Sequence, residues 1–353
     1  MEKNNKIIVI SIITILSLLL LILLLLNNNK SKTNNKSKIV KEENIFISIV
    51  TKSDQKIYGI TDNNKEIELL DISEYNGGVV YTYINSKLYL YLQKYQENKP
   101  YSNNSILGYI DLNSSNYNLT TLTHVEDEGY PNSIAILDNT IYYTSSASKI
   151  IYNYNIDTKE KSTLTINNLN NNYSINLYSI ENNTLIYSNP GSTNEKPKIG
   201  IIDINLSTNQ ELVTNSIIEY IYNNKIIYKK YNSEKNFSQW KYYEYDVANS
   251  QTRQISDITT SNQGIYNSLI VPVEDYYIYV NENALYKYID NQDEKIIELD
   301  GSIDNIILMG DKTLNIEYID DLNQQYKYLN LNLDNLTTKE TTENNYSKVL
   351  YIK

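Results

Sequence analysis

An aspartate recurs at a nearly constant spacing through most of this chain. The recurring positions, 43 to 49 residues apart, are Asp62, Asp111, Asp157, Asp203, Asp246, Asp290 and Asp334. Each aspartate follows a segment rich in tyrosine and β-branched residues and precedes a polar segment, which is typical of a strand, a turn and a further strand. A repeat of this length has the size of one four-stranded propeller blade, because a single unit cannot bury its apolar face alone.

The third unit displays the blade pattern most clearly. Its four predicted strands, in chain order, cover 133–137, 140–144, 149–156 and 161–165. Between the first two strands stands Asp138-Asn139, and these residue types tolerate the positive φ of a tight hairpin. The corresponding turns of other units are Asn85-Ser86, Asn182-Asn183, Asn223-Asn224, Glu274-Asp275 and Asp311-Lys312. No long helical periodicity follows residue 43, so the sequence predicts an all-β domain.

The two ends of the array complement each other. The first unit begins at about Ile45 and has three strands but no inner one, whereas the chain ends with a strand, 347–353, that has no blade of its own. We predict that this last strand supplies the inner strand of the first blade, which closes the ring and removes exposed sheet edges. Seven aspartates and this closure predict a β-propeller of seven four-stranded blades; six or eight blades follow if one unit is degenerate.

Two segments carry a resemblance to known propellers. They read TIYYT…KIIYNYNIDTKEKSTLT, within 140–165, and LIYS…KIGIIDINLSTNQELVT, within 185–214. Both resemble the repeats of TolB-like and LDL-receptor-type (YWTD) propellers, and in particular bacterial propellers of unknown function related to the latter. The YWTD tetrapeptide is degraded to YYTS at 142–145 and to IYSN at 186–189. The resemblance covers 45–353 and implies a propeller that binds a protein or another ligand, usually outside the cytoplasm.

A long apolar segment precedes the repeats. Residues 7–26 contain no charged residue, and a helix of twenty apolar residues is long enough to cross the hydrocarbon core of a bilayer. No cleavage-site pattern follows this segment, so we interpret it as an uncleaved transmembrane anchor rather than a signal peptide. The chain then consists of a tail (1–6), the anchor, a polar Asn/Lys-rich linker (27–43) and the propeller domain (44–353).

The orientation of the predicted anchor follows from two opposing arguments. More lysines follow the apolar segment than precede it, and the positive-inside rule therefore favours a cytoplasmic propeller. A short basic tail before an apolar segment is, however, the usual form of an exported signal anchor. We expect a single-pass protein of the plasma membrane with its propeller outside the cytoplasm, against the distribution of lysines.

Composition excludes several kinds of site. The chain has no cysteine and one histidine, His124, which excludes disulfides, zinc–thiolate sites and two-histidine metal centres within one chain. The formal net charge of −11 and the presence of one arginine, Arg253, disfavour binding to nucleic acid. Motifs such as GxSxG, the P-loop and HExxH are absent. We therefore expect no catalytic or metal-ligating residues, no cofactor and no nucleic-acid partner, and we favour a protein that is not an enzyme.

Candidate binding residues occur in two loops on the propeller face where variable loops gather, which is the default binding surface. The loop at 124–132 could bind a cation or a basic ligand, or it could be a solvated acidic turn. Its candidates are His124, Glu126, Asp127, Glu128 and Tyr130. The loop at 232–240 contains Phe237 and Trp240, which could anchor a partner. Alternatively, Trp240 begins a strand and packs between blades.

The sequence favours a membrane-anchored, non-catalytic propeller that binds a protein, peptide or glycan at the cell envelope. Two other functions stay open, because the fold does not decide among them. One is a carbohydrate-active enzyme with carboxylates in the axial channel, since paired carboxylates need only spatial proximity. The other is a structural scaffold of an envelope complex. The chain has 36 tyrosines, which could suggest stacking on a ligand, but they recur at fixed strand positions, which predicts that most of them pack between blades.

Overall fold

The computed structural model describes most of the chain after residue 44. The described residues are 45–94, 105–125, 129–146, 150–166, 175–180, 184–189, 191, 196–232, 239–256, 260–261, 269–310, 312–342 and 346–352. They all belong to one compact unit, Ile45–Lys353. The predicted anchor at 7–26 and the linker at 27–43 lie outside the described residues. Within the described ranges, no helix has the length and apolar character needed to cross a membrane.

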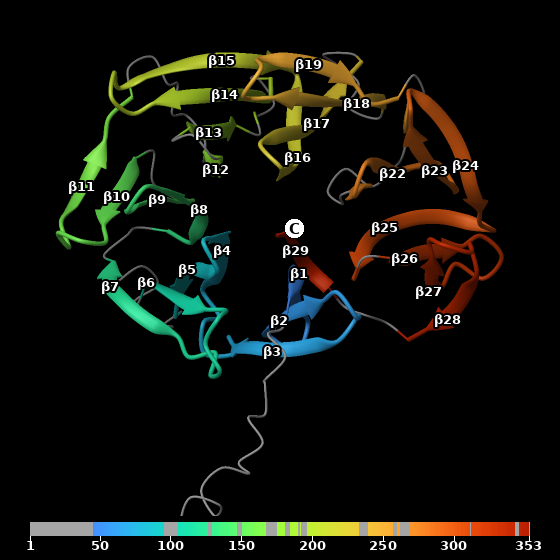
Figure 1. The fold of residues 1–353 in the computed structure, drawn as a ribbon, viewed down its shortest axis with the longest axis horizontal. Coiled ribbons are helices and arrows are strands. Elements are labelled where there is room, and N and C mark those ends of the chain that lie inside the picture. Colours follow the sequence, from blue (N-terminus) through green and yellow to red (C-terminus); the bar gives the residue numbers. More distant parts are fainter. Residues whose placement is uncertain are drawn as a thin grey trace, which may run out of the picture. The chain divides into compact units, whose positions relative to one another are not determined.

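Seven antiparallel sheets surround a central axis, with one strand of each nearest to it (Figure 1). From the axis outward, blade 1 contains β29 (Tyr346–Tyr351), β1 (Phe46–Lys52), β2 (Lys56–Thr61) and β3 (Glu66–Asp71). Blade 2 contains β4 (Gly78–Ile84), β5 (Lys87–Gln93), β6 (Ser105–Asp111) and β7 (Thr120–Val125). Blade 3 contains β8 (Pro131–Leu137), β9 (Thr140–Ser145), β10 (Ile151–Asn155) and β11 (Lys161–Leu164). Blade 4 contains β12 (Asn176–Ile180), β13 (Thr184–Asn189), β14 (Lys198–Asp203) and β15 (Thr208–Thr214).

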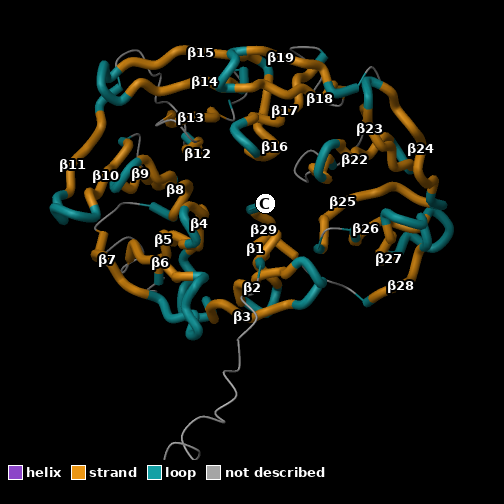
Figure 2. Tube along the Cα trace, in the orientation of Figure 1, coloured by secondary structure: helices purple, strands orange, loops and turns teal. Residues whose placement is uncertain are grey.

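The remaining blades follow the same order, as the strand trace in Figure 2 shows. Blade 5 contains β16 (Ser216–Tyr222), β17 (Lys225–Tyr231), β18 (Gln239–Asp246) and β19 (Gln251–Gln254), and the short β20 (Thr260–Ser261) also pairs with β18. Blade 6 contains β21 (Ile270–Val273), β22 (Tyr276–Asn281), β23 (Ala284–Ile289) and β24 (Gln292–Glu298). Blade 7 contains β25 (Gly301–Met309), β26 (Thr313–Asp320), β27 (Tyr326–Asn332) and β28 (Thr338–Thr341). The prediction of seven four-stranded blades is confirmed.

The C-terminal strand closes the ring. Strand β29 pairs antiparallel with β1, and Ser48 lies opposite Tyr351 while Val50 lies opposite Val349. The first blade therefore joins the two ends of the described chain, as its missing inner strand predicted. Because both partners contribute backbone hydrogen bonds, neither β1 nor β29 leaves an open edge on this side of the sheet.

The hairpins between the first two strands of a blade have the predicted backbone conformation. Asn85 and Ser86 have φ of 49° and 60°, and Asn223 and Asn224 have φ of 48° and 61°. Asparagine tolerates the left-handed region because its short amide bonds locally, and consecutive positive φ angles match the twist of the flanking strands. Asp138 takes the same conformation, with φ of 50°.

Apolar side chains fill the spaces between neighbouring blades. Six clusters of buried residues lie there, the largest spanning blades 5, 6 and 7. In three blades, a tyrosine of the second strand stacks on the opposite tyrosine of the third, at centroid distances of 5.4 to 5.5 Å. These pairs are Tyr143–Tyr152, Tyr228–Tyr243 and Tyr279–Tyr286. The second-strand members Tyr143, Tyr228 and Tyr279 also belong to apolar clusters shared with a neighbouring blade, so these tyrosines pack between blades as predicted.

Blade 4 replaces the stacked partner with glycine. Tyr187 occupies the position of the stacking tyrosine, and Gly200 lies opposite it. A Cβ at Gly200 would lie 2.4 Å from the Tyr187 ring, so this strand accepts only glycine if the ring keeps its place. The glycine preserves the tyrosine contact with blade 3, where Tyr187 belongs to the shared apolar cluster.

Candidate functional site

The inner strands enclose a cavity of about 400 Å³ on the propeller axis. Side chains of β4, β8, β12, β16 and β29 line it, so blades 1 to 5 all contribute. The lining combines aromatic rings with polar groups, among them Tyr81, Asn132, Asn176, Tyr178, Glu219 and Tyr220. We call this space the axial cavity.

Blades 3 and 4 supply a neutral polar wall. The side-chain amide NH₂ of Asn132 donates to the side-chain oxygen of Asn176 at 3.0 Å and to the carbonyl oxygen of Ile175 at 2.9 Å. Ser133 lies beside it, bonds the Thr144 hydroxyl at 2.7 Å and accepts from the backbone N–H of Leu177. This network connects two blades through polar groups at the cavity and fixes the orientation of both asparagine amides.

Blade 5 supplies the charged part of the wall. A bulge in β16 places Glu219 between Ile218 and Tyr220, outside the regular pairing with β17. The Glu219 carboxylate accepts from the Lys229 ammonium group at 2.9 Å, and each of these side chains is only 5% exposed. The ammonium group also lies 5.2 Å from the centre of the Trp240 ring. A buried ion pair stabilises a fold weakly compared with apolar packing, so stability alone does not account for its position beside the cavity.

The charge of Glu219 acts on the tyrosines around it. Burial, together with the nearby Glu219 carboxylate, raises the pKa of Tyr178 to about 12. Burial also raises the pKa of Tyr242 well above its ordinary value, and Glu219 contributes in the same direction. Both phenols are therefore neutral hydrogen-bonding groups at physiological pH.

An aromatic contact crosses the axis at one end of the cavity. Tyr220 of β16 and Tyr351 of β29 meet edge to face, with ring centroids 5.9 Å apart. Blades 5 and 1 are not neighbours in the ring, so this contact connects opposite sides of the axis. The Tyr220 hydroxyl is buried and has no hydrogen-bond partner among the described residues.

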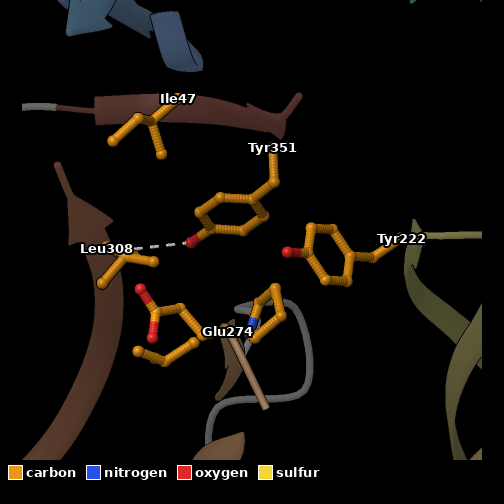
Figure 3. A pocket seen from close by; sticks show the side chains of 7 residues that line it. Ile47, Tyr222, Glu274, Leu308 and Tyr351 are labelled. Atoms are coloured by element: carbon orange, nitrogen blue, oxygen red, sulfur yellow. Dashed lines mark hydrogen bonds between the residues drawn. The ribbon is translucent and has the colours of Figure 1, made fainter. Parts of the chain in front are cut away.

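A smaller space of about 70 Å³ lies on the other side of Tyr351. Ile47, Tyr222, Glu274 and Leu308 line it together with Tyr351, and Figure 3 shows the Tyr222 hydroxyl directed towards the Tyr351 ring, with the Glu274 carboxylate close to Leu308. The Tyr351 hydroxyl accepts a long hydrogen bond, 3.4 Å, from the backbone N–H of Leu308 (Figure 3). Tyr351 thus borders both spaces.

The residues that the sequence singled out do not converge on this cavity. His124 is exposed on β7, the outermost strand of blade 2, and Tyr130 is 44% exposed before β8. Trp240 is 1% exposed and packs edge to face against Tyr231 and Tyr242. Trp240 therefore begins β18 and packs in the core, the second of the two interpretations given above. Glu126, Asp127, Glu128 and Phe237 lie outside the described residues.

Sequence reasoning missed the axial cavity because its residues sit on strands rather than in loops. The usable signal was the segment SIIEYIY at 216–222, where Glu219 interrupts an apolar strand. A carboxylate inside such a strand requires a partner, and Lys229 in the next strand, between Tyr228 and Tyr231, supplies it. Among the described residues, no group of three or more acidic or histidine side chains could hold a metal ion.

Comparisons with known proteins locate the chain by fold alone. The sequence matches no protein family and no curated protein. A putative 6-phosphogluconolactonase from Bacteroides fragilis has a similar structure, with a TM-score of 0.51 and 9% identity over 89% of this chain and 99% of that one. TolB from Acinetobacter baumannii gives 0.39 and 12%, covering 85% and 80% of the two chains. The nidogen/laminin complex gives 0.36 and 10%, covering 87% and 93%.

Other solved structures are longer, and this chain spans only 37% of some of them. At identities of 9 to 12%, likeness shows the fold and carries no activity with it. The seven four-stranded sheets and the closure by β29 identify the fold of the chain as a seven-bladed β-propeller, and TolB and the nidogen/laminin complex are among the solved structures similar to it.

Proposed function

We propose that this chain is a non-catalytic binding protein of the cell envelope, anchored in the plasma membrane through 7–26, that binds a protein, peptide or glycan. The observation that carries the binding role is the axial cavity. Its volume of about 400 Å³ lies within the usual range of ligand pockets, and rigid strands hold its polar groups in place. The exposed residues His124 and Tyr130 offer a loop surface for a larger partner.

Binding is favoured over glycan hydrolysis by the carboxylates at the axis. Glycosidases place two carboxyl groups on either side of one bond, roughly 5 to 10 Å apart. Among the described residues that line the axial cavity, Glu219 is the only carboxylate, and Lys229 already engages it. Glu274 borders the smaller space and does not line the axial cavity. This arrangement supports recognition of a ligand rather than acid–base chemistry on it.

A thiol probe can test whether ligands enter the axial cavity. The chain has no cysteine, so Ser179→Cys introduces a single thiol at the cavity wall, and Ser73→Cys introduces one in an exposed turn. The full chain in mild detergent is labelled with a maleimide in the presence of pooled peptide or glycan libraries. We expect one pool to slow labelling at position 179 and none at position 73. Equal labelling rates at position 179 with every pool would contradict the binding role of the cavity.

The location of the propeller is tested on intact cells. With a tag at the C-terminus, external protease should remove the tag while a cytoplasmic control protein stays intact. Protection of the tag would contradict the exported orientation and would indicate that the lysines at 30–41 set the topology. Cross-linking in the same cells distinguishes a scaffold, which yields one stable stoichiometric partner, from a receptor for a small or exchanging ligand.

A further inference from the structure

The charges at the axial cavity restrict the kind of ligand that fits it. Glu219 is the only charged residue among the described residues of its wall, and the carboxylate is paired with Lys229. The pair is neutral as a whole. An anionic ligand would meet no unpaired cation there, and a cationic ligand would have to share the Glu219 carboxylate with Lys229, whose charge would repel it. A charged ligand would therefore lose its hydration without gaining a partner, which is unfavourable in a buried site.

The same wall is too polar for an apolar ligand. A carboxylate has two oxygens with about four acceptor positions, and the single contact with Lys229 leaves acceptor capacity for hydroxyl groups. The bond between Asn132 and Asn176 uses the amide NH₂ of the first and the oxygen of the second. Within the described part of the chain, the Asn132 oxygen and the Asn176 NH₂ thus stay available as one acceptor and one donor. Acceptors and donors side by side suit groups that both give and receive hydrogen bonds.

Aromatic rings supply the remaining surface. Tyr178 lines the cavity, and the crossed pair of Tyr220 and Tyr351 borders it at the axis. Tyr81 also reaches the lining, but its ring is 5% exposed and packs in the core between blades 1 and 2. Rings present flat apolar faces with a negative centre, and these faces attract the weakly positive C–H groups of a flat polar molecule. Hydroxyl-binding groups on blades 3 to 5 therefore face a cavity that also offers stacking surfaces.

We propose that the axial cavity binds a neutral mono- or disaccharide. This inference rests on the proposed binding function and names its ligand class. Glu219 accepts hydrogen bonds from sugar hydroxyls, the amides of Asn132 and Asn176 accept and donate one each, and the tyrosine rings pack against the C–H face of the sugar ring. A volume of about 400 Å³ accommodates a molecule of this size.

The test uses the full chain in mild detergent and three sets of immobilised oligosaccharides: neutral, uronate-containing and amine-containing. A peptide array of equal size is the fourth set. We expect binding to neutral oligosaccharides that persists at high salt, because no net charge contributes to it. The best neutral oligosaccharide should also slow thiol labelling of Ser179→Cys and leave labelling of Ser73→Cys unchanged.

Matched variants connect this binding to the wall. Asn176→Ala should weaken affinity for that oligosaccharide by about tenfold or more, the effect of one or two lost hydrogen bonds. The control is Asn209→Ala, on the outer strand β15 and away from the cavity. It removes an amide that donates to the Tyr187 hydroxyl, and it should change affinity by less than about twofold. If thermal unfolding shows that Asn176→Ala is unfolded, Tyr178→Leu is measured instead, because it removes the ring that packs against the sugar and should also weaken affinity.

The outcomes separate this inference from the proposed function. Selective binding of uronate-containing or amine-containing sugars, or of peptides, with protection of position 179, would overturn the neutral saccharide and leave the binding function intact. Neutral sugar binding that Asn176→Ala and Tyr178→Leu leave unchanged would also overturn this inference, because the site would lie elsewhere. The absence of binding in all four sets, without protection of position 179, would overturn both.

Discussion

Blades 3 and 5 share one framework and differ at the axis. In each blade a tyrosine of the second strand stacks on the directly opposite tyrosine of the third, Tyr143 on Tyr152 and Tyr228 on Tyr243. The centroid distances are 5.4 and 5.5 Å and the interplanar angles 18° and 17°. The repeated sequence thus produces the same local packing in both blades.

The residue after the stacked tyrosine distinguishes the two blades. In blade 3 it is Thr144, whose hydroxyl donates to the carbonyl oxygen of Ile175 in blade 4 at 2.8 Å. In blade 5 it is Lys229, whose ammonium group is buried against Glu219 at 2.9 Å. One position of the repeat therefore carries a neutral hydroxyl network in blade 3 and an ion pair in blade 5. Framework positions keep the blades alike, and this neighbouring position differentiates the axial wall.

Opening the ring should lower the free energy of unfolding more than any other change, because blades 3 and 5 both belong to the ring that β29 closes. Deletion of 347–353 removes most of β29, bares the edge of β1 and takes Tyr351 from the axis. We expect a loss of about 5 kcal/mol or more of unfolding free energy, a large part of a typical domain's stability. Thermal unfolding followed by circular dichroism measures the loss, with Tyr346→Phe as a control that keeps the strand. An unchanged melting curve would show that blades 3 and 5 do not depend on closure.

Breaking the ion pair of blade 5 should have the next largest effect. Lys229→Met leaves the Glu219 carboxylate buried without its cation, a change that destabilises a protein by about 3 to 5 kcal/mol. The double variant Glu219→Gln with Lys229→Met should recover most of this loss, since no net charge stays buried. The free energy of unfolding of both variants is measured by urea unfolding. A double variant as unstable as the single one would mean that packing, rather than charge, sets the energy of this position.

The equivalent change in blade 3 should be smaller. Thr144→Val keeps the side-chain shape and removes a buried hydroxyl that bonds Ser133 and the Ile175 carbonyl oxygen. We expect a loss of about 1 to 3 kcal/mol, the range for buried groups left without a partner. Urea unfolding measures this loss of unfolding free energy. A loss as large as that of Lys229→Met would remove the energetic difference between the two blades.

The smallest expected effect is on the pH dependence of stability at alkaline pH. Burial raises the pKa of Tyr228 to about 12, partly offset by the hydrogen bond with Thr252. An unfolded tyrosine titrates near pH 10. The folded state therefore holds this proton more tightly, so its contribution to stability is complete below pH 10 and is lost as pH rises towards 12. Tyr228→Phe should flatten the decline of unfolding free energy between pH 9 and 12, as measured by urea unfolding. An identical slope in both proteins would mean that Tyr228 does not titrate differently on unfolding.

Several features of the fold could be predicted because their causes are local. The hairpin at Asn223-Asn224 needs positive φ, and asparagine tolerates it. The stacked tyrosines follow from two-residue periodicity within paired strands, so their burial was predictable without knowing the partner blade. The missing inner strand of the first unit and the surplus strand at 347–353 predicted closure, because every sheet edge needs a partner.

The axial cavity could not be predicted by the same reasoning. Tyr220 and Tyr351 lie in different blades and meet only because the ring brings their strands to one axis. Glu219 lies at a bulge, where the register between β16 and β17 shifts, and no turn motif in the sequence predicts this shift. The candidates chosen from loops followed the rule that loops carry function. Trp240 shows its limit, because a large apolar ring at a strand start gains more from burial than from exposure.

The sequence by itself determined the number of blades and their turns, since these depend on hydrogen bonds and periodicity within about one repeat. It also indicated the closing strand, because the strand missing from the first unit is matched by a surplus strand at the other end of the repeats. Only the tertiary structure decided which side chains face the axis together. That choice depends on contacts between strands more than one hundred residues apart, such as Tyr220 with Tyr351. The pairing of Glu219 with Lys229 depends on both the sequence and the tertiary structure. A buried charge demands a partner on physical grounds, but the fold determines that this pair borders a cavity.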